Sequence, residues 1–225
     1  FRYSPAPRTQ DATGQARPLS KGKEFNDIIL AGGEDAEAIL VFASHHLLEL
    51  SVVNAVTAVH RLAKCPAATR KDPRLTALLD RVRYMFQTSV PKEATQGHAW
   101  NFHVDTRALT NVAWAQAKMQ LRDPTMLQYI SEEVAARVKQ CTAQQIANCA
   151  WAFATLGLKH TRLLTALTRE AVGRIAEFSP QNLMCTCRCY ELLRRSPPAV
   201  SANFRHSISP SWPGRWRPWA SGANR

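Results

Sequence analysis

The sequence predicts an all-α protein, an α-solenoid of helix-turn-helix repeats with about 37 residues per repeat. Three observations predict this fold. No stretch alternates apolar and polar residues as a strand does, whereas Ala, Leu, Arg and Gln are abundant. The segment NVAWAQAKMQL (111–121) returns 37 residues later as NCAWAFATLGL (148–158). The segments that follow the two copies, 123–138 and 160–175, also match in residue type.

The first part of the chain is predicted as a disordered lead-in or linker over residues 1–23. It holds three prolines and five basic residues and has no apolar face. The chain begins with Phe1, which favours a processed form or a fragment. The segment has the composition of a remnant beside an organellar transit peptide, and an ordinary disordered terminus fits equally well. The helical repeat domain is expected over 24–184, with one or two helices in 24–50.

A degenerate first unit is expected near 50–87, where the sequence aligns Asn54 with Asn111. The two asparagines are 57 residues apart instead of 37. Insertions in repeat proteins fall in loops. We therefore expect six of the extra residues in the loop 65–71 and fourteen around 89–102.

Two full units follow at 106–141 and 142–178, and a partial fourth unit is expected at 179–195. The repeat pattern breaks off after Met184. In the register of the repeat, Arg188 stands where the tryptophan is expected.

Local signals mark where these helices begin and end. Asp72 and Asp123 each precede a proline, which is typical of an N-cap followed by the first helical residue. Thr142 and Gln145 have the spacing of a capping box. Gly157 is expected to separate the two helices of its unit.

The residues that repeat identically are expected to pack the fold. Small alanines let neighbouring helices approach, and one tryptophan fills the space between layers. We predict a structural role, with the asparagines bonding backbone between helices, for Asn54, Asn111, Trp114, Asn148 and Trp151.

The last segment, 196–225, is predicted as a disordered basic tail rich in Arg, Pro and Trp. The abrupt change in composition favours a frameshift, a retained intron or an unusual splice near residues 180–190. The alternative is a basic, aromatic tail that binds RNA by stacking.

The repeat resembles the octotricopeptide and heptatricopeptide repeat proteins of algal and protist organelles. The N..AWA.A.LGL pattern carries this resemblance over the two full units. The segment VVNAVTAVHRLAK (52–64) also resembles the region before such repeats in RAP-domain and FAST-kinase-like proteins. The resemblance implies sequence-selective binding of organellar RNA by the first helix of each unit. No RAP domain is recognisable, which puts functions that require one in doubt.

Residues that read bases should differ between repeats, so the variable polar positions of the first helices are the candidate RNA contacts. They are Arg61, Arg107, Lys118, Gln144, Gln145 and Thr155. An ordinary solvated helix face would present the same residue types.

The net charge of +12 favours an anionic partner. Seven basic residues and one acidic residue lie in 185–225, so half of the excess belongs to this terminal segment. The rest of the chain is moderately basic.

Other site classes find little support. The six cysteines do not form a secreted disulfide framework. Cys185 and Cys189 could share a helix face, but a structural zinc ion requires four ligands. No P-loop, GxSxG or HExxH motif is present. No run of 18 apolar residues could span a membrane. We expect no enzyme activity, no metal and no cofactor.

We therefore expect a protein of the mitochondrial matrix or the chloroplast stroma that binds single-stranded organellar RNA. Its role would lie in transcript stability, processing, translation or ribosome assembly, alongside ribosomal or other RNA-processing proteins. The alternative is a protein–protein scaffold, such as a structural component of an organellar ribosome.

Overall fold

The structure, a computed structural model, describes residues 20–65, 70–89 and 104–194. Every regular element in these ranges is helical, and none of the described residues forms a strand. The prediction of an all-α protein is therefore confirmed for them. Most of the predicted lead-in, up to residue 19, and the predicted tail from residue 196 lie outside the described ranges.

Nine α-helices and two short 3₁₀ turns make up the described part of the chain. They are α1 (Lys21–Ala31), α2 (Ala36–His45), α3 (Val52–Leu62), α4 (Pro73–Gln87), α5 (Thr106–Met119), α6 (Pro124–Ala136), η3 (Val138–Gln140), α7 (Ala143–Thr155), α8 (Thr161–Gly173), η4 (Ile175–Glu177) and α9 (Pro180–Arg194). Helix α1 begins at Lys21, within the predicted lead-in.

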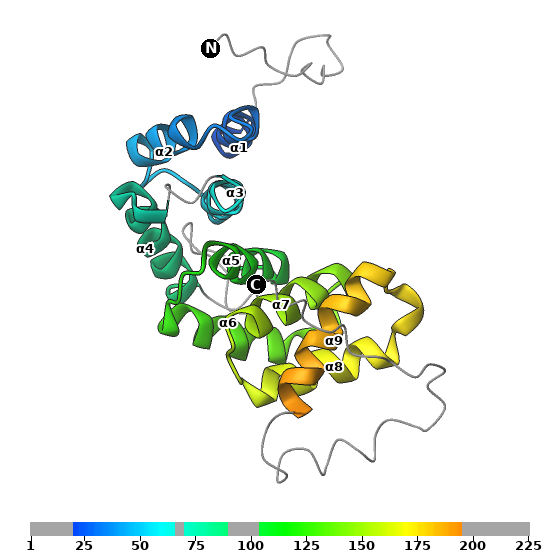
Figure 1. Cartoon of the computed structure of the whole chain (residues 1–225). Coiled ribbons are helices and arrows are strands. Elements are labelled where there is room, and N and C mark those ends of the chain that lie inside the picture. Colours follow the sequence, from blue (N-terminus) through cyan, green and yellow to red (C-terminus); the bar gives the residue numbers. More distant parts are fainter. Residues whose placement is uncertain (1–19, 66–69, 90–103, 195–225) are drawn as a thin grey trace, which may run out of the picture.

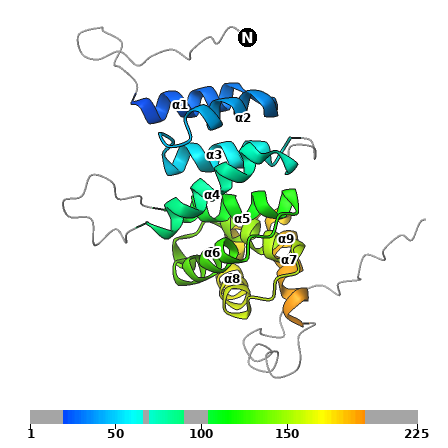
Figure 2. The same cartoon turned by 90° about the vertical axis from the view of Figure 1, so that its left-hand side faces the viewer.

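The helices lie in two rows. In the first row, α1 packs on α3, α3 on α5, α5 on α7 and α7 on α9. In the second row, α2 packs on α4 and α6 packs on α8. Figure 1 shows α1, α3 and α5 one below another, with α2 and α4 to their left and α6 below α5, and Figure 2 shows the same helices in successive layers. Each helix of the first row therefore has a neighbour on one or both sides along the row.

The predicted helix starts are confirmed. The side chains of Asp72 and Asp123 accept hydrogen bonds from backbone N–H groups in the first turns of α4 and α6. Thr142 and Gln145 form the predicted capping box of α7. Ser51 forms a second capping box, at the start of α3. Each cap satisfies a backbone donor that the helix leaves free.

The caps correct the predicted register of the first unit. Helices α3, α5 and α7 begin directly after equivalent capping residues, Ser51, Asp105 and Thr142. Counted from these caps, Asn54 is the third residue, whereas Asn111 and Asn148 are the sixth. The alignment of Asn54 with Asn111 is therefore wrong by three residues, and Thr57 is the counterpart of the two later asparagines.

The helix bounds agree with the predicted size of the first insertion. The caps of the first and second helices are 18 residues apart at 105–123 and at 142–160. They are 21 residues apart at 51–72. The loop between α3 and α4 (63–72) nevertheless holds ten residues, six more than the four between α5 and α6 (120–123), as predicted. The caps are only three residues farther apart because α3 is three residues shorter than α5. The second predicted insertion, around 89–102, falls almost wholly outside the described residues.

The first helices of the two full units end in the same way. Gly157 has a φ of +68°, and Gln120, which stands 37 residues earlier, has a φ of +56°. The N–H groups of Leu121 and Leu158 each donate to a carbonyl five residues back, with an N–O distance of 2.9 Å in both cases. The left-handed residue turns the chain toward the second helix, so the role predicted for Gly157 is confirmed.

Two arginines tie the end of each unit to its beginning. The guanidinium group of Arg137 donates to the carbonyl of Val104 at 2.8 Å, and that of Arg174 donates to the carbonyl of Cys141 at 2.9 Å. Both arginines also pair with a glutamate four residues earlier. These contacts recur after 37 residues, and they were not predicted from the sequence.

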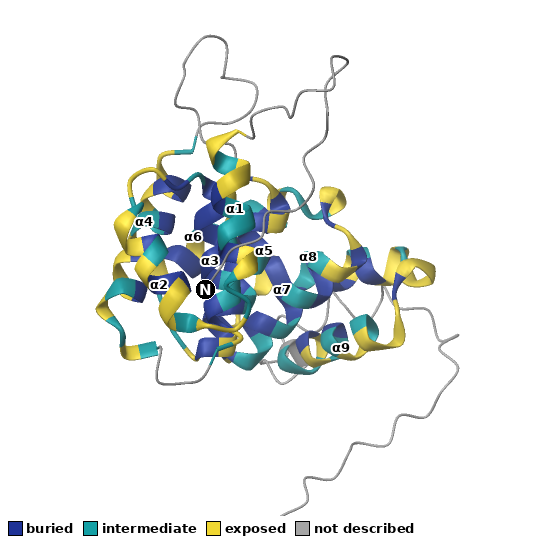
Figure 3. Ribbon diagram, turned by 90° about the horizontal axis from the view of Figure 1, so that it is seen from above, coloured by how far each residue is buried: buried dark blue, intermediate teal, exposed yellow. Residues whose placement is uncertain are grey.

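The repeated alanines pack as predicted, and the tryptophans pack somewhat differently. Ala113, Ala115 and Ala117 are fully buried, as are their counterparts on α7 as far as Ala152. Trp114 and Trp151 are only half-buried and lie at the margin of the core. Figure 3 shows that the buried residues lie mainly where the helices face one another. The tryptophans therefore close the gaps between successive first-row helices and keep part of their rings accessible.

Candidate nucleic-acid interface

One side of the first-row helices remains uncovered. The second, sixth, ninth and thirteenth residues after each cap share a helix face, because their spacings are four, three and four. None of these residues on α3, α5 and α7 is buried, and neither is Lys64, which lies in the turn two residues beyond the end of α3. We call them the first-row face: Val53, Thr57, His60 and Lys64; Arg107, Asn111, Trp114 and Lys118; Gln144, Asn148, Trp151 and Thr155.

An aromatic strip runs along the middle of the first-row face. The ring of His60 lies 4.9 Å from that of Trp114, and Trp114 lies 6.3 Å from Trp151, measured between centroids. The rings are tilted by 43° and 34°. All three are half-buried. The strip thus crosses three helices and offers aromatic surface to a ligand.

Two amides stand beside this strip. Asn111 and Asn148 each precede a tryptophan of the strip by three residues, which places them next to it on the helix. Neither side chain forms a hydrogen bond with any residue in the described part of the chain, and both are half-buried. The predicted bond between helices exists instead at Asn54, whose amide donates to the carbonyl of Gly22 at 2.7 Å.

Positive charge gathers at the α3–α5 side of the face. Burial is the main reason that the pKa of His60 is lowered to about 4, and the nearby charges of Lys64, Arg61 and Arg107 lower it further. His60 is therefore a neutral ring at physiological pH. Among the described residues, none forms an ion pair with these three cations or with Lys118, so their charges are not neutralised within this part of the protein.

Three of the six predicted RNA contacts lie on the first-row face and are exposed: Arg107, Lys118 and Gln144. Arg61 is half-buried and lies one position beyond His60, at the edge of the face.

Gln145 and Thr155 are placed less favourably. The side-chain oxygen of Gln145 accepts hydrogen bonds from the N–H of Thr142 and from the hydroxyl of Thr106, both at 3.1 Å. Its carbonyl oxygen is thus occupied in capping α7 and in joining α7 to α5. The hydroxyl of Thr155 belongs to the face by register, but it is buried and has no hydrogen-bond partner among the described residues.

A comparison with protein-family models places part of the chain in a family. The model of the RNA-editing substrate-binding complex 6 protein matches residues 74–205. This match covers more than half of the 225-residue chain. The chain belongs to the RNA-editing substrate-binding complex 6 protein family. A search of curated proteins gives no match.

The family match extends from the start of α4 past the end of α9. It includes α5 and α7 with both of their asparagine–tryptophan pairs. It also continues for 21 residues beyond Met184, where the sequence repeat breaks off. The match does not confirm the resemblance to octotricopeptide and heptatricopeptide repeat proteins, which stays a prediction.

His60 and Lys64 were missed as members of the face. The error came from aligning asparagines rather than helix starts. Ser51 and Asn54 have the same spacing as Thr142 and Gln145, and this shared capping pattern would have indicated the register. Counting from this pattern gives His60 the position that the tryptophans hold on α5 and α7, and it gives Lys64 the position of Lys118.

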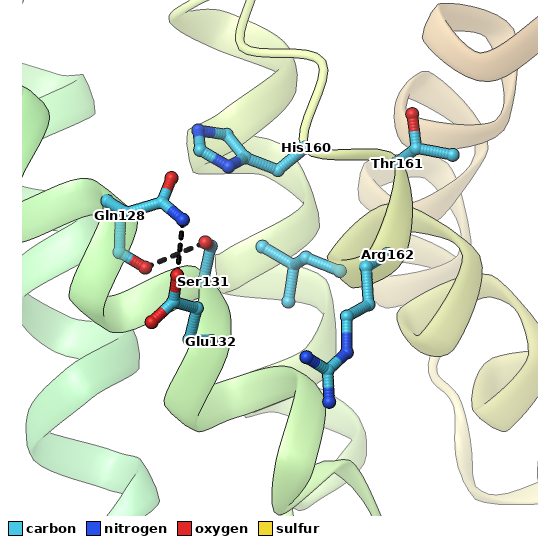
Figure 4. Close-up of a pocket in the computed structure, with 7 residues that line it drawn as sticks. Gln128, Ser131, Glu132, His160, Thr161 and Arg162 are labelled. Carbon is cyan, nitrogen blue, oxygen red and sulfur yellow. Dashed lines mark hydrogen bonds between the residues drawn. The ribbon is translucent and has the colours of Figure 1, made fainter.

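A second, shallow hollow lies between α6 and the start of α8 (Figure 4). It is lined by Gln128, Ser131, Glu132, His160, Thr161, Arg162 and Leu163. The amide of Gln128 donates to the carboxylate of Glu132, and the hydroxyl of Ser131 donates to the carbonyl of Gln128 at 2.8 Å. Because the carboxylate of Glu132 is part of its lining, this hollow is a poorer match to an RNA backbone than the first-row face.

Other site classes gain no support in the described residues. Burial raises the pKa of the Cys141, Cys149 and Cys189 thiols, so the protonated form is favoured. Within residues 20–65, 70–89 and 104–194, no three His, Cys, Asp or Glu side chains are grouped as metal ligands. No helix of this part is long and apolar enough to cross a membrane.

Proposed function

We propose that this chain is an RNA-binding protein of an RNA-editing complex and that it holds single-stranded RNA on the first-row face. The observation that carries the proposal is the aromatic strip with unpaired cations beside it, in a member of the RNA-editing substrate-binding complex 6 protein family. Cationic groups bind the phosphates, and aromatic rings stack on unpaired bases.

The arrangement favours single strands over duplexes. The face is a row of side chains along packed helices, and in the described residues no helix protrudes from it to enter a groove. A-form RNA hides its base edges in a deep, narrow major groove, whereas unpaired bases can turn outward onto aromatic rings. We therefore propose that the bases lie on the strip and that the phosphates lie near Arg107 and Lys118.

We also propose that the fold is an α-solenoid with 37 residues per repeat. The recurrence of the helix ends at Gln120 and Gly157 and of the contacts made by Arg137 and Arg174 supports this assignment. An array of this kind presents a long surface to an extended ligand.

The remaining parts of the proposal concern place and partners. The family name refers to a complex, so protein partners are expected beside the RNA. We propose an organelle, a mitochondrion or a chloroplast, as the site of action. We propose no catalytic step for this chain, and a role in transcript processing through the editing complex fits best.

Fluorescence anisotropy with a labelled 12-nucleotide RNA tests the proposal. The whole protein should bind the single strand more tightly than a duplex of the same sequence. Affinity should fall steeply between 50 and 200 mM salt, because binding to phosphates releases counterions.

The variants Arg107→Ala and Lys118→Ala should each weaken binding by about threefold to tenfold at low salt. Together they should make the slope of log affinity against log salt shallower by roughly 1.4, which is about 0.7 for each phosphate that is no longer neutralised. Arg169→Ala is the matched control, because Arg169 is an exposed arginine on α8, away from the face. Equal losses in the control and in the face variants would exclude the first-row face as the binding surface. A protein that binds no RNA and captures only proteins would be a scaffold.

A further inference from the structure

The first-row face contains the same side-chain pair twice. Asn111 with Trp114 and Asn148 with Trp151 occupy the sixth and ninth positions of α5 and α7. The two rings are in contact across the helices, at 6.3 Å between centroids. The tryptophans also pack against the core, but in the described residues both amides lack a hydrogen-bond partner and are free to bond a ligand.

We propose that the two pairs form a twin nucleotide site that binds two successive unpaired nucleotides carrying the same base. The inference rests on the proposed RNA-binding function and adds a selectivity to it. In each half of the site the tryptophan stacks on a base and the asparagine bonds to an edge of that base.

The spacing of the rings fits two neighbouring nucleotides that are not stacked on each other. Stacked bases in a helical strand lie about 3.4 Å apart along the axis. The ring step of 6.3 Å is nearly twice that distance. A strand whose successive bases rest on the two rings is therefore extended, with its bases separated, as proteins that read single-stranded RNA require.

The amides supply the selectivity. A side-chain amide offers a donor next to an acceptor, and it pairs with a base edge that presents the complementary pattern. Equal side chains in equal positions present equal patterns, so both halves prefer the same base. A reader of two different bases would need two different side chains at the sixth position.

The face residues that differ between the two helices are at the second and thirteenth positions. The second position holds Arg107 on α5 and Gln144 on α7. The thirteenth position holds Lys118 and Thr155. The α5 half is thus richer in charge and is expected to hold the phosphates more firmly, while the base preference of the two halves stays equal.

The test uses RNA oligomers of equal composition and the full chain. Homopolymers of A, C and U first identify the preferred base. Two such bases are then placed in a 12-nucleotide background of a disfavoured base, either adjacent or separated by four nucleotides. The oligomer with adjacent bases should bind about fivefold more tightly than the separated one, because one register then satisfies both amides.

Two variants test which residues produce the preference for adjacent bases. Asn111→Ala and Asn148→Ala should each reduce the difference between adjacent and separated bases to less than twofold, while the salt dependence stays unchanged. Gln87→Ala is the matched control, because Gln87 is an exposed amide at the end of α4 in the second row. It should keep the full difference.

The outcomes separate this inference from the proposed function. Equal binding of the two oligomers by the wild-type protein, with a normal salt dependence, would overturn the twin site and leave the RNA-binding function intact. The same holds if the preference persists in both Asn→Ala variants. If no RNA binds at any salt concentration, the proposed function fails, and the twin site fails with it.

Discussion

His60 shows how the environment of a single residue sets the pH dependence of the fold. In the unfolded chain a histidine has a pKa near 6.5, whereas burial and neighbouring cations lower the pKa of His60 to about 4 in the folded protein. Between these two values the unfolded state binds more protons, so stability is lost as the pH falls from about 6.5 toward 4. Partial exposure screens the effect, and we expect His60 to account for about 1 kcal/mol between pH 7 and pH 5.

The variant His60→Phe keeps a ring in the strip and removes the titration. Urea unfolding at pH 7 and at pH 5 should show a smaller loss of stability in this variant than in the wild type. His45→Gln is the control, because His45 is exposed at the end of α2, and it should behave as the wild type does. An equal pH dependence in His60→Phe and the wild type would contradict the assignment.

Gln120 and Gly157 have the same left-handed backbone conformation but differ in residue type. Both have positive φ, at +56° and +68°. A side chain meets a steric penalty in this region and glycine does not. A Cβ at Gly157 would meet no atom within 4 Å, so its cost there comes from the backbone alone.

We expect Gly157→Ala to lower the free energy of unfolding by about 1 kcal/mol. Gln120→Gly should raise it by about 0.5 kcal/mol, since the gain is partly offset by the larger entropy of glycine in the unfolded chain. Chemical denaturation measures both. Changes of the same sign in the two variants would show that side-chain contacts, and not φ, dominate at these positions.

At the scale of elements, each unit is closed by an arginine. Arg174 donates to the carbonyl of Cys141 at 2.9 Å and pairs with Glu170 at 3.3 Å and with Glu177 at 2.6 Å. The carbonyl lies just before α7, so the bond fixes the end of α8 against the start of α7. Without this donor a partly buried carbonyl would have no partner, which costs more than the removal of an exposed ion pair.

Arg174→Ala should therefore destabilise the protein by about 1–2 kcal/mol. Arg162→Ala, at an exposed arginine in the first turn of α8, should change stability by less than about 0.5 kcal/mol. Thermal unfolding of the two variants makes the comparison. A destabilisation in Arg174→Ala no larger than that in the control would show that this bond adds no more stability than an exposed contact.

At the scale of the whole molecule, the sequence predicted the structural features that depend on residues close together in the chain. The all-α class and the capping roles of Asp72, Asp123 and Thr142 follow from residue types at short spacings, and the structure agrees. The register of α3 was missed because Asn54 has the same residue type as the repeated asparagines, whereas its role is to complete the capping box of Ser51. The bond between Arg174 and Cys141 joins residues 33 positions apart, and no pattern of neighbouring residues predicts a bond over such a distance.

On the first-row face, the exposed charges could be predicted. That the amides of Asn111 and Asn148 have no hydrogen-bond partner in the described residues depends on how the neighbouring helices pack, which the sequence does not show.

The two-row arrangement also predicts which helices unfold locally most often. Helix α5 has first-row neighbours on both sides, α3 and α7, whereas α1 packs in its row only against α3. In a linear array each element is stabilised by its nearest neighbours. Native-state hydrogen exchange should therefore be slowest in α5 and α7 and fastest in α1 and α2.

The side chain of Asn54 then tests whether the stabilisation is local. It joins α3 to α1 through its bond to the carbonyl of Gly22, and it completes the capping box of α3 with Ser51. Asn54→Ala should accelerate exchange in α1 by about tenfold and leave α7 unchanged, because the lost bonds act only on α1 and on the start of α3. Thr57→Ala, which removes a hydrogen bond within α3, should accelerate exchange in α1 much less. If Asn54→Ala accelerates exchange equally in α1 and α7, the helices unfold as one cooperative unit, and the nearest-neighbour description fails.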